Sequence, residues 1–396
     1  MNTTKIKDVC VVVSGTTPKS TEKRYWNGTH VWITPAELTE DSFIVSDSER
    51  HITDEAVKAT GLKPFPKGTV LLSSRAPIGK VAIAGCDMYC NQGFKNLICS
   101  ESIYNLYLYY FLKSKTEYLN SLGRGATFKE ISKGIVEDIN IPFPAYDEQI
   151  HIAKQLQKIT ELIALKKRQY RYLDDIIRSR FLEMFGDPAV NSKKLPVVKL
   201  GDIAFITKLA GFEYTKYIKY QDHGDIIMVR GLNCKSGKLV LDDIYWIDKS
   251  VSDLLPRSKL AKGDIVMTYV GTVGEVAIVD KDDTYHLAPN VAKISLYDKK
   301  TNNPYFWNYM FTISKNYILR FASTTTQSAL GMEKIRKIPF IVPETEDQNR
   351  FVGLLTQVDK SKMAVQKSLD ELETLKKSKY RGTISLHLLE DVSHML

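Results

Sequence analysis

The sequence repeats itself, and this repeat limits the possible folds more than any other feature. KGTVLLSSRAPIGKVAI at 67–83 reappears as KGDIVMTYVGTVGEVAI at 262–278, with the outer letters kept and the middle letters changed. The offset between matched residues is 195 at Gly68 and Gly263, and 199 at Gln149 and Gln348. So small a drift over such a span indicates a duplication, and a duplication predicts two similar modules.

Other stretches extend the match. NQGFKNL (91–97) faces PNVAKIS (289–295), with Gln92 on Asn290 and Lys95 on Lys293, an offset of 198. YLYYFLKS (107–114) faces YFWNYMFT (305–312), which sets Tyr107 on Tyr305. The repeated glycines, Gly68 with Gly263 and Gly79 with Gly274, indicate that both modules need the same turns.

Length and composition agree with a soluble multidomain protein. A chain of 396 residues exceeds the size of one typical core, so two or more domains are expected. With 43% apolar and 26% charged residues the composition is that of an ordinary globular protein. The net charge of +9 favours an acidic partner such as nucleic acid, although charge alone serves solubility equally well.

The cysteines and the apolar runs indicate the compartment. No signal peptide and no membrane-spanning run is visible, so a cytoplasmic protein without membrane contact is expected. An odd number of cysteines without a C-x-x-C pair predicts reduced, structural thiols rather than disulfides or a zinc site. These residues are Cys10, Cys86, Cys90, Cys99 and Cys234.

Each copy begins with short β-branched runs and ends in a helical pattern. VCVVVSG, GTVLLSS and KVAIAG in one copy, and IAFITK, GDIVMTYV and EVAIVD in the other, have the composition and boundaries of strands. The helical stretches carry apolar residues spaced alternately by three and four, as a coiled-coil seam requires. The seam residues are Ile152, Leu156, Ile159, Ile163, Tyr170, Leu173 and Ile177, then Phe351, Leu355, Val358, Val365, Leu369 and Leu372.

Two matched long helices favour packing against each other over each packing on its own module. Lys166 of one seam matches Val365, and Lys362 matches Ile163, so a polar residue in one seam has an apolar counterpart. At about 1.5 Å per residue such a helix is on the order of 50 Å long, as a spacer is. The predicted boundaries are a β-rich domain at 1–146, a helix at 147–186, a β-rich domain at 187–343, a helix at 344–381 and a tail at 382–396.

Three motifs carry a family resemblance. They are PAYDEQIHIA at 144–153, with the pattern P-x-x-x-E-Q-x-x-I-A, LDDIIRSRFLEMFGDP at 173–188 and KLGDIA at 199–204. With the order of modules and helices, they closely resemble the specificity subunit of Type I restriction-modification enzymes, over essentially the whole chain.

The resemblance implies an α+β fold with two tandem, pseudo-symmetric target recognition domains, separated by two long conserved helices that pair as an antiparallel coiled coil. Each domain would read one half of a split sequence in double-stranded DNA. The subunit would itself be non-catalytic. Adenine-N6 methylation, ATP-dependent translocation and cleavage, with S-adenosylmethionine, ATP and Mg, would belong to two modification and two restriction subunits. The residues agree, because two similar modules on a spacer can contact two half-sites as dimeric readers do.

The stretches that differ between the two modules supply side chains of the types that read base edges in the major groove. For any one of them, the alternative is a solvated or backbone-capping side chain. The candidates are Ser74, Arg75, Asn91, Gln92, Lys95, Arg124, Thr127 and Lys129 in the first module, and Arg230, Tyr269, Thr272, Asn290, Lys293, Thr324, Thr325, Thr326 and Gln327 in the second. Lys216, Lys219 and Lys235 are expected to contact phosphates instead.

Catalytic motifs are not apparent in the sequence. It has no glycine-rich S-adenosylmethionine loop and no G-x-x-x-x-G-K-[ST] phosphate loop, and its histidines lack metal-ligand spacing. NNPY at 302–305 resembles the N-P-P-Y motif of adenine methyltransferases but has Asn303 in place of proline, and the repeat places it at the start of a helix. A stand-alone methyltransferase or nuclease, and a coiled-coil protein scaffold, remain alternative functions.

Overall fold

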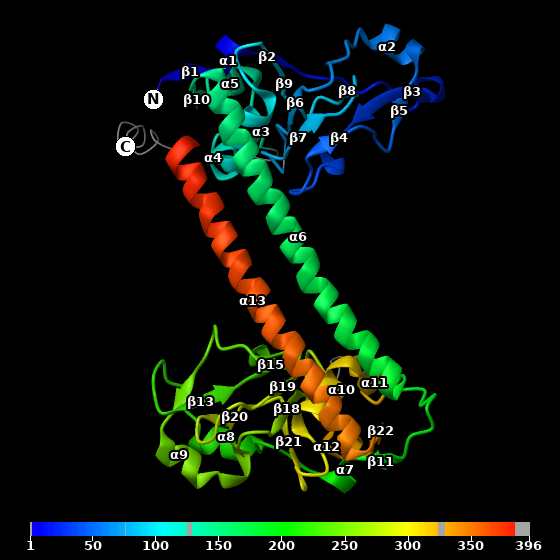
Figure 1. Cartoon of the computed structure of the whole chain (residues 1–396), viewed down its shortest axis with the longest axis vertical. Helices are drawn as coiled ribbons and strands as arrows, with labels where there is room; N and C mark the ends of the chain where they lie inside the picture. Colours follow the sequence, from blue (N-terminus) through cyan, green and yellow to red (C-terminus); the bar gives the residue numbers. More distant parts are fainter. Residues whose placement is uncertain (1, 76, 125–128, 324–328, 385–396) are drawn as a thin grey trace. The chain divides into compact units, whose positions relative to one another are not determined.

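The chain forms two compact units in the computed structural model, which describes residues 2–75, 77–124, 129–323 and 329–384. Unit 1 comprises Met1–Lys167 with Gln366–Leu396, and unit 2 comprises Arg168–Val365. The boundaries fall inside two long helices, α6 (Tyr146–Phe185) and α13 (Thr345–Ile384) (Figure 1). Each unit therefore contains part of both helices beside its own sheets.

Unit 1 is β-rich, with short helices between its strands. Its elements are β1 (Thr3–Lys5), α1 (Ile6–Val9), β2 (Cys10–Val13), η1 (Lys23–Tyr25), β3 (Trp26–Ile33), η2 (Pro35–Glu37), β4 (Ile44–Val45), β5 (His51–Ile52), α2 (Asp54–Thr60), β6 (Val70–Leu72), β7 (Val81–Ala84), β8 (Tyr89–Cys90), β9 (Asn96–Cys99), α3 (Asn105–Ser114), α4 (Thr116–Ser121), α5 (Lys133–Glu137) and β10 (Asn140–Pro142).

Unit 2 has the same order of principal elements. They are β11 (Val197–Lys199), α7 (Leu200–Ile203), β12 (Ala204–Lys208), α8 (Gly211–Tyr217), β13 (Ile226–Val229), η3 (Gly231–Asn233), β14 (Cys234–Lys235), β15 (Lys238–Leu239), β16 (Trp246–Ile247), α9 (Lys249–Leu254), η4 (Pro256–Ser258), β17 (Lys259–Leu260), β18 (Ile265–Thr268), β19 (Val276–Ile278), β20 (Tyr285–Leu287), β21 (Val291–Leu296), α10 (Pro304–Ile313), α11 (Lys315–Leu319), α12 (Met332–Lys337) and β22 (Pro339–Ile341).

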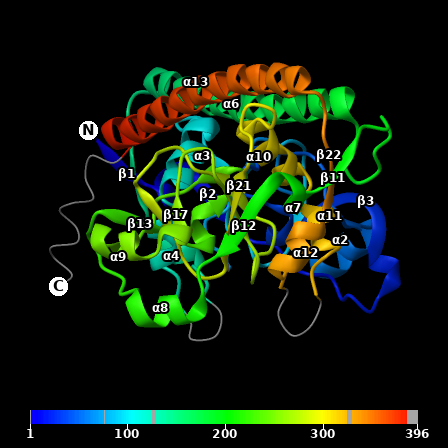
Figure 2. The ribbon, with the colours of Figure 1, turned by 90° about the horizontal axis from the view of Figure 1, so that it is seen from below.

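The sheets confirm the duplication. The main sheet of unit 1 has the order β2-β9-β6-β7-β4, and that of unit 2 has the corresponding order β12-β21-β18-β19. The antiparallel pair β12 and β21 lies side by side in Figure 2. A second sheet repeats as well, since β3 pairs with β8 in parallel and β13 pairs with β20 in parallel. The fold is thus two tandem α+β modules.

The repeated glycines adopt the backbone conformation that their repetition predicts. Gly79 and Gly274, which close the loops of the central hairpins β6–β7 and β18–β19, have φ of +88° and +84°. A side chain in this left-handed region is strained, so glycine is required. An added Cβ at Gly79 would also lie 3.2 Å from Cγ2 of Thr116, which starts α4.

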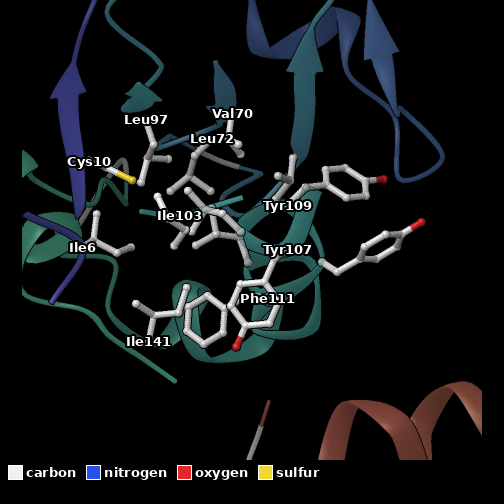
Figure 3. Packing of buried hydrophobic residues seen from close by; sticks show 14 of the residues in the cluster. Ile6, Cys10, Val70, Leu72, Leu97, Ile103, Tyr107, Tyr109, Phe111 and Ile141 are labelled. Atoms are coloured by element: carbon white, nitrogen blue, oxygen red, sulfur yellow. The ribbon is translucent and has the colours of Figure 1, made fainter. Parts of the chain in front are cut away.

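One apolar cluster joins the main sheet of unit 1 to its helices. Val70 and Leu72 of β6 contribute to it beside Tyr107 and Phe111 of α3 (Figure 3). Leu156 of α6 is fully buried in the same cluster. The first part of α6 therefore packs on its own module, and each such buried side chain contributes about 1.5–3 kcal/mol of transfer free energy.

The helices also pair with each other, and unit 2 shows the direction. Asp174 of α6 contacts Lys362 of α13, with 2.6 Å between Oδ1 and Nζ. Further along α6, the ring of Phe181 contacts that of Phe351, with centroids 5.3 Å apart. Partner numbers fall as α6 numbers rise, so the pairing is antiparallel. In unit 1, Lys167 and Glu373 form an ion pair at 3.5 Å.

The seam residues are shielded from solvent to different degrees. Tyr170, Leu173, Leu355, Val358 and Leu372 are half-buried. The others are buried: Ile152, Leu156, Ile159, Ile163, Ile177, Phe351, Val365 and Leu369.

A buried glutamine attaches the start of each long helix to its module. Gln149 Oε1 accepts the backbone N–H of Tyr104 at 2.9 Å, just before α3, and Gln348 Oε1 accepts that of Asn303 at 3.0 Å, just before α10. Helices α3 and α10 therefore correspond at an offset of 199, so the alignment of Tyr305 with Tyr107 is wrong by one residue. NNPY lies at the start of α10, with Asn303 as the N-cap, and the matching helix α3 is present in the first copy, as expected.

Candidate nucleic-acid interface

In both units the residues that differ between the repeated segments 67–83 and 262–278 lie in a hairpin loop, and this loop is closed in the same way. In unit 1 the carbonyl of Ser73 accepts the N–H of Gly79 at 3.1 Å, and in unit 2 the carbonyl of Thr268 accepts that of Gly274 at 2.9 Å. Each of these two carbonyls belongs to a residue with a buried hydroxyl. The backbone that presents the loops is duplicated, whereas the side chains between these residues differ.

Three separate stretches of sequence meet beside each loop. In unit 1 the N–H of Ser74 donates to the carbonyl of Gly93 at 2.8 Å, and the carbonyl of Ser74 accepts the N–H of Ile131 at 2.9 Å. Tyr269 makes the two equivalent backbone contacts in unit 2, at 3.0 and 2.8 Å. The backbone thus brings together candidates that lie up to about fifty residues apart in sequence.

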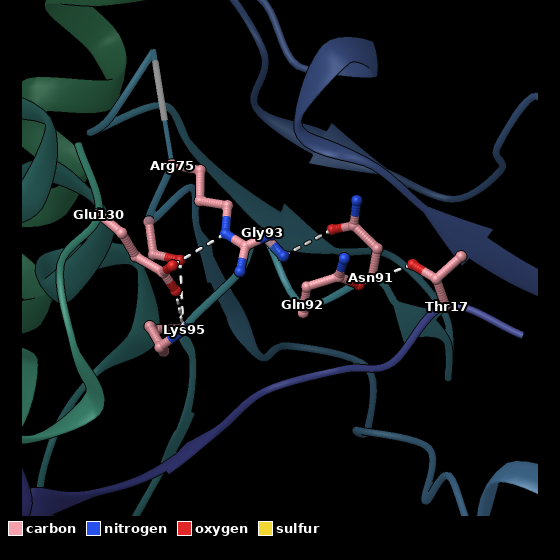
Figure 4. Close-up of polar contacts among 8 residues, drawn as sticks. Thr17, Arg75, Asn91, Gln92, Gly93, Lys95 and Glu130 are labelled. Atoms are coloured by element: carbon pink, nitrogen blue, oxygen red, sulfur yellow. Dashed lines mark hydrogen bonds and ion pairs between the residues drawn. The ribbon is translucent and has the colours of Figure 1, made fainter. Parts of the chain in front are cut away.

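A carboxylate that the sequence analysis did not single out organises the unit 1 candidates. Glu130 accepts from Nε of Arg75 at 2.9 Å through Oε2 and from Nζ of Lys95 at 3.1 Å through Oε1 (Figure 4). Lys95 also donates to Oγ of Ser74 at 3.4 Å. Ser74 and Lys95 are buried, whereas the Arg75 side chain is 45% exposed. Arg75 is therefore the most exposed member of this cluster, ahead of Glu130, whose side chain is 34% exposed.

The charge state of Glu130 follows from its two partners. Partial burial by itself would raise the pKa of Glu130, but hydrogen bonds and charge from Lys95 and Arg75 outweigh it and lower the pKa below its ordinary value. Glu130 is therefore ionised near neutral pH, and the three side chains together carry one net positive charge. Its only sequence signal was a single acidic residue in the basic stretch GRGATFKEI.

Asn91 and Gln92 have different surroundings, although they are adjacent. Oδ1 of the half-buried Asn91 accepts the N–H of Gly93 at 2.9 Å, which shapes the turn before β9 (Figure 4). Oε1 of the exposed Gln92 accepts the hydroxyl of Thr17 at 2.6 Å. The first contact is a capping interaction, whereas Gln92 keeps an exposed amide. Thr17 is a second neighbour that the sequence analysis missed.

The remaining unit 1 candidates flank Glu130. Arg124 and Glu130 exchange two backbone hydrogen bonds, of 3.1 and 2.9 Å, so these two residues lie side by side. The side chains of Arg124 and Lys129 are exposed. Thr127 lies outside the described residues.

In unit 2 the corresponding loop presents an aromatic ring. Nζ of Lys208 lies 5.3 Å from the ring centroid of the half-buried Tyr269, a cation–π contact. Thr272 and Asn290 are exposed, and Asn290 has a φ of +70°. The last four candidates, Thr324, Thr325, Thr326 and Gln327, lie outside the described residues.

Two other unit 2 candidates are occupied by acidic partners. Nζ of Lys293 contacts the buried Asp264 at 3.4 Å and donates to the carbonyl of Lys259. Arg230 pairs with Asp243 at 2.8 Å, and its side chain is only 19% exposed. Neither candidate joins Tyr269, so the structure brings together fewer unit 2 candidates than unit 1 candidates.

Strand pairing corrects the sequence alignment of this stretch by one residue. Leu97 pairs with Val70, and Ile294 pairs with Ile265. The matches that follow are Gly93 with Asn290, Lys95 with Ala292 and Asn96 with Lys293. Successive strand residues face opposite sides, so Lys95 and Lys293 lie on opposite faces of their sheets. The sequence alignment of Gln92 with Asn290 and of Lys95 with Lys293 followed residue type and not strand register.

The expected phosphate contacts lie on the surface. Lys216, Lys219 and Lys235 are exposed, as contact with a DNA backbone requires.

All five cysteines are free thiols. Within residues 2–75, 77–124, 129–323 and 329–384, no three His, Cys, Asp or Glu side chains are grouped so that they could hold a metal ion. No helix in that part of the chain is long and apolar enough to cross a membrane.

Most of the chain matches one family model, the Type I restriction modification DNA specificity domain, over residues 1–173 and 193–374. The Type I restriction enzyme MjaIX specificity subunit of Methanocaldococcus jannaschii is 44% identical over 186 residues, 46% of this chain and 43% of that protein. The match thus spans less than half of that relative. The MjaVIII specificity subunit of the same organism is 23% identical over 287 residues, 69% of this chain and 68% of that protein.

Solved structures share the fold. The S subunit of a Type I restriction-modification system from M. genitalium has a TM-score of 0.54 at 16% identity, covering 96% of this chain and 94% of that chain. A chain from a structural study of complex assembly and conformational transition in the type I R-M system has a TM-score of 0.56 at 15% identity, covering 96% of both chains.

Proposed function

The chain belongs to the Type I restriction-modification DNA specificity family, and from this premise we propose that it reads a bipartite sequence in double-stranded DNA. Each unit would read one half-site. The chain would itself be non-catalytic and would position modification subunits on the target.

The duplicated loop frame carries this proposal. Ser74 and Tyr269 make the same two backbone contacts with different side chains, as expected of two modules that share a scaffold and read different bases. Arginine, asparagine and glutamine are the side chains that recognise purine edges in the major groove, and Arg75 and Gln92 are exposed beside the unit 1 loop.

The charge supports a DNA partner. The chain carries a net charge of +9, and its exposed lysines can contact phosphates. Phosphate contacts release counterions, so the affinity for DNA should fall steeply with salt concentration. A salt-insensitive or absent affinity would instead favour a protein scaffold.

The proposed partners supply the chemistry. We expect two modification subunits that use S-adenosylmethionine and two restriction subunits that use ATP and Mg, all in the cytoplasm. A relative of this fold was studied in the assembly of a type I R-M system. The purified chain with S-adenosylmethionine alone should not methylate DNA, and methylation under these conditions would contradict the proposal.

The decisive experiment coexpresses the chain with its cognate modification subunit in a host that lacks DNA methylation and maps methyladenine across the genome. The expected result is a split motif, two short specified halves around a fixed unspecified gap. Exchange of residues 1–143 for the equivalent module of a relative should change one half only. An unmodified genome despite a copurifying complex would refute the proposed function.

A further inference from the structure

The cluster around Glu130 is present in unit 1 only. A backbone bridge joins Arg75 to Glu130, and the matching bridge in unit 2 joins Val270 to Ala329. Strand register matches Lys95 with Ala292. All three charged positions of unit 1 are therefore apolar in unit 2, on a duplicated backbone. A contact needed only for the scaffold would be expected in both copies.

Glu130 has an inner and an outer partner. On the inner side it pairs with Lys95, whose side chain is 9% exposed. On the outer side it pairs with Arg75, whose side chain is 45% exposed. Two backbone hydrogen bonds with Arg124 fix the carboxylate-bearing residue itself. The orientation of Arg75 is thus determined by a group anchored in the protein.

The contact leaves the recognition end of Arg75 available. Glu130 accepts a hydrogen bond from Nε, and no hydrogen bond or ion pair to another residue in the described part of the chain engages Nη1 or Nη2. Guanine presents two acceptors, O6 and N7, that a guanidinium binds through two parallel hydrogen bonds. An arginine held at Nε binds such a pair end-on, and holding it in place beforehand reduces the entropy lost on binding.

We propose that Glu130 is a positioning residue that holds Arg75 for bidentate recognition of a guanine, so that unit 1, and not unit 2, specifies a G·C pair at this point of the target. The inference rests on the proposed function and names one base of the half-site. Lys95 neutralises Glu130 from inside, so that a carboxylate can lie beside DNA.

The experiment uses full-length variants coexpressed with the modification subunit and mapped by genomic methyladenine. The wild-type motif should contain a G·C pair in the half that changes when residues 1–143 are exchanged. Arg75→Ala should lower the preference for that pair about 5- to 150-fold and retain every other position. Arg75→Lys, which keeps the charge but not the fork, should relax the same position.

Glu130→Gln separates positioning from a general structural role. It should relax that one position, to a smaller extent than Arg75→Ala, because the arginine is present but no longer held by charge. The matched control is Glu137→Gln, which removes a carboxylate of similar exposure from the ion pair with Lys133 on α5 of the same unit. This control should leave the motif unchanged.

Each contrary result has a distinct meaning. A uniform loss of methylation at all sites with Arg75→Ala would make Arg75 a phosphate contact and overturn the proposal. An unchanged motif, a unit 1 half-site without a G·C pair, or a whole half-site blurred by Glu130→Gln would also overturn it. If Arg75→Ala does not assemble, Arg75→Lys carries the same test. Absent methylation with the wild-type chain would instead refute the proposed function itself.

Discussion

Nζ of Lys95 lies 3.1 Å from Oε1 of Glu130 inside unit 1, and the two matching positions in unit 2 are Ala292 and Ala329. The protein therefore contains two versions of one structural position, one ionic and one apolar. The apolar version shows that the backbone does not need the ion pair. Ionic pairs of this kind seldom add net stability over apolar replacements.

This comparison predicts a non-additive pair of substitutions. Glu130→Ala leaves the buried ammonium of Lys95 without its carboxylate, and should lower the free energy of unfolding of unit 1 by about 1–3 kcal/mol. Adding Lys95→Ala, which copies unit 2, should recover part of that loss. Urea denaturation of the full chain, followed by tryptophan fluorescence, measures both. A double variant as destabilised as the sum of the single variants would contradict the prediction.

The buried glutamines predict equal effects in the two units. Gln149 also donates from Nε2 to the carbonyls of Ser102 and Pro144, and Gln348 donates to those of Thr301 and Pro343. Replacing either glutamine by leucine leaves one buried N–H and two carbonyls without this partner. Each substitution should destabilise its unit by about 2–4 kcal/mol, since an orphaned buried group costs about 1–3 kcal/mol.

The same denaturation experiment tests this symmetry. Gln157→Leu provides the control, because Gln157 lies on α6 and donates to the exposed Glu161 at 2.9 Å. It should change stability by less than about 0.5 kcal/mol. A large loss for one buried glutamine and almost none for the other would show that the two helix anchors are not equivalent.

The repeat made most of the fold predictable from the sequence. Gly79 and Gly274 are repeated because both loops need a residue in the left-handed conformation. Such glycines stay the same in both copies, whereas residues needed only for packing differ. The seam residues are spaced as a helix pair requires, but Leu156 and Phe351 also fill the cores of their modules. A seam pattern cannot distinguish packing on the other long helix from packing on the module, because either partner buries the same face of the helix.

The site was less predictable, for two physical reasons. Register along a strand depends on hydrogen-bond pairing, which residue identity does not reveal. Aligning Lys95 with Lys293 by identity was therefore wrong by one residue, and a shift of one residue moves a side chain to the other face of the sheet. Glu130 was missed because its role depends on three stretches that meet only in the folded chain. The exposed Arg75 was recognisable from its residue type, whereas its carboxylate partner was not.

The ion pair in the helix seam of unit 2 predicts unequal effects for its two members. Lys362 is 15% exposed, lies 4.5 Å from the ring of Tyr170 and pairs with Asp174, which is 55% exposed. Asp174→Ala removes the carboxylate from a largely buried ammonium and should cost about 1–3 kcal/mol. Lys362→Leu leaves only an exposed carboxylate and matches Ile163 of the other seam, so it should be neutral or stabilising.

Thermal and urea unfolding of the two variants test the order of these effects. Lys367→Leu is the control, since Lys367 is exposed on the same helix and pairs only loosely with Glu371, at 4.0 Å. It should leave stability nearly unchanged. If Lys362→Leu proves more destabilising than Asp174→Ala, the cation–π contact with Tyr170 contributes more than the desolvation of the ammonium costs.

A buried histidine predicts how the stability of unit 2 depends on pH. His286 on β20 is fully buried, and Nδ1 lies 3.1 Å from the carbonyl of Leu287. Burial, and to a smaller extent the charges of Lys259 and Lys293, lower its pKa below the ordinary 6.5, although contacts with the carbonyls of Leu287 and Leu255 oppose this. The unfolded chain therefore takes up a proton below pH 6.5 that the folded unit does not bind.

Unit 2 should accordingly lose stability as the pH falls from 6.5 toward the lowered pKa of His286, by at most about 1.4 kcal/mol per pH unit from this group. His286→Gln, which cannot be protonated, should flatten the dependence in that window. Urea denaturation between pH 7.5 and 5.5 measures the difference from the wild type, in which all other histidines are the same. His223→Gln, which replaces an exposed histidine of the same unit, is the control and should retain the wild-type slope. Equal slopes for the wild type and His286→Gln would mean that His286 is protonated in the folded unit as readily as in the unfolded chain.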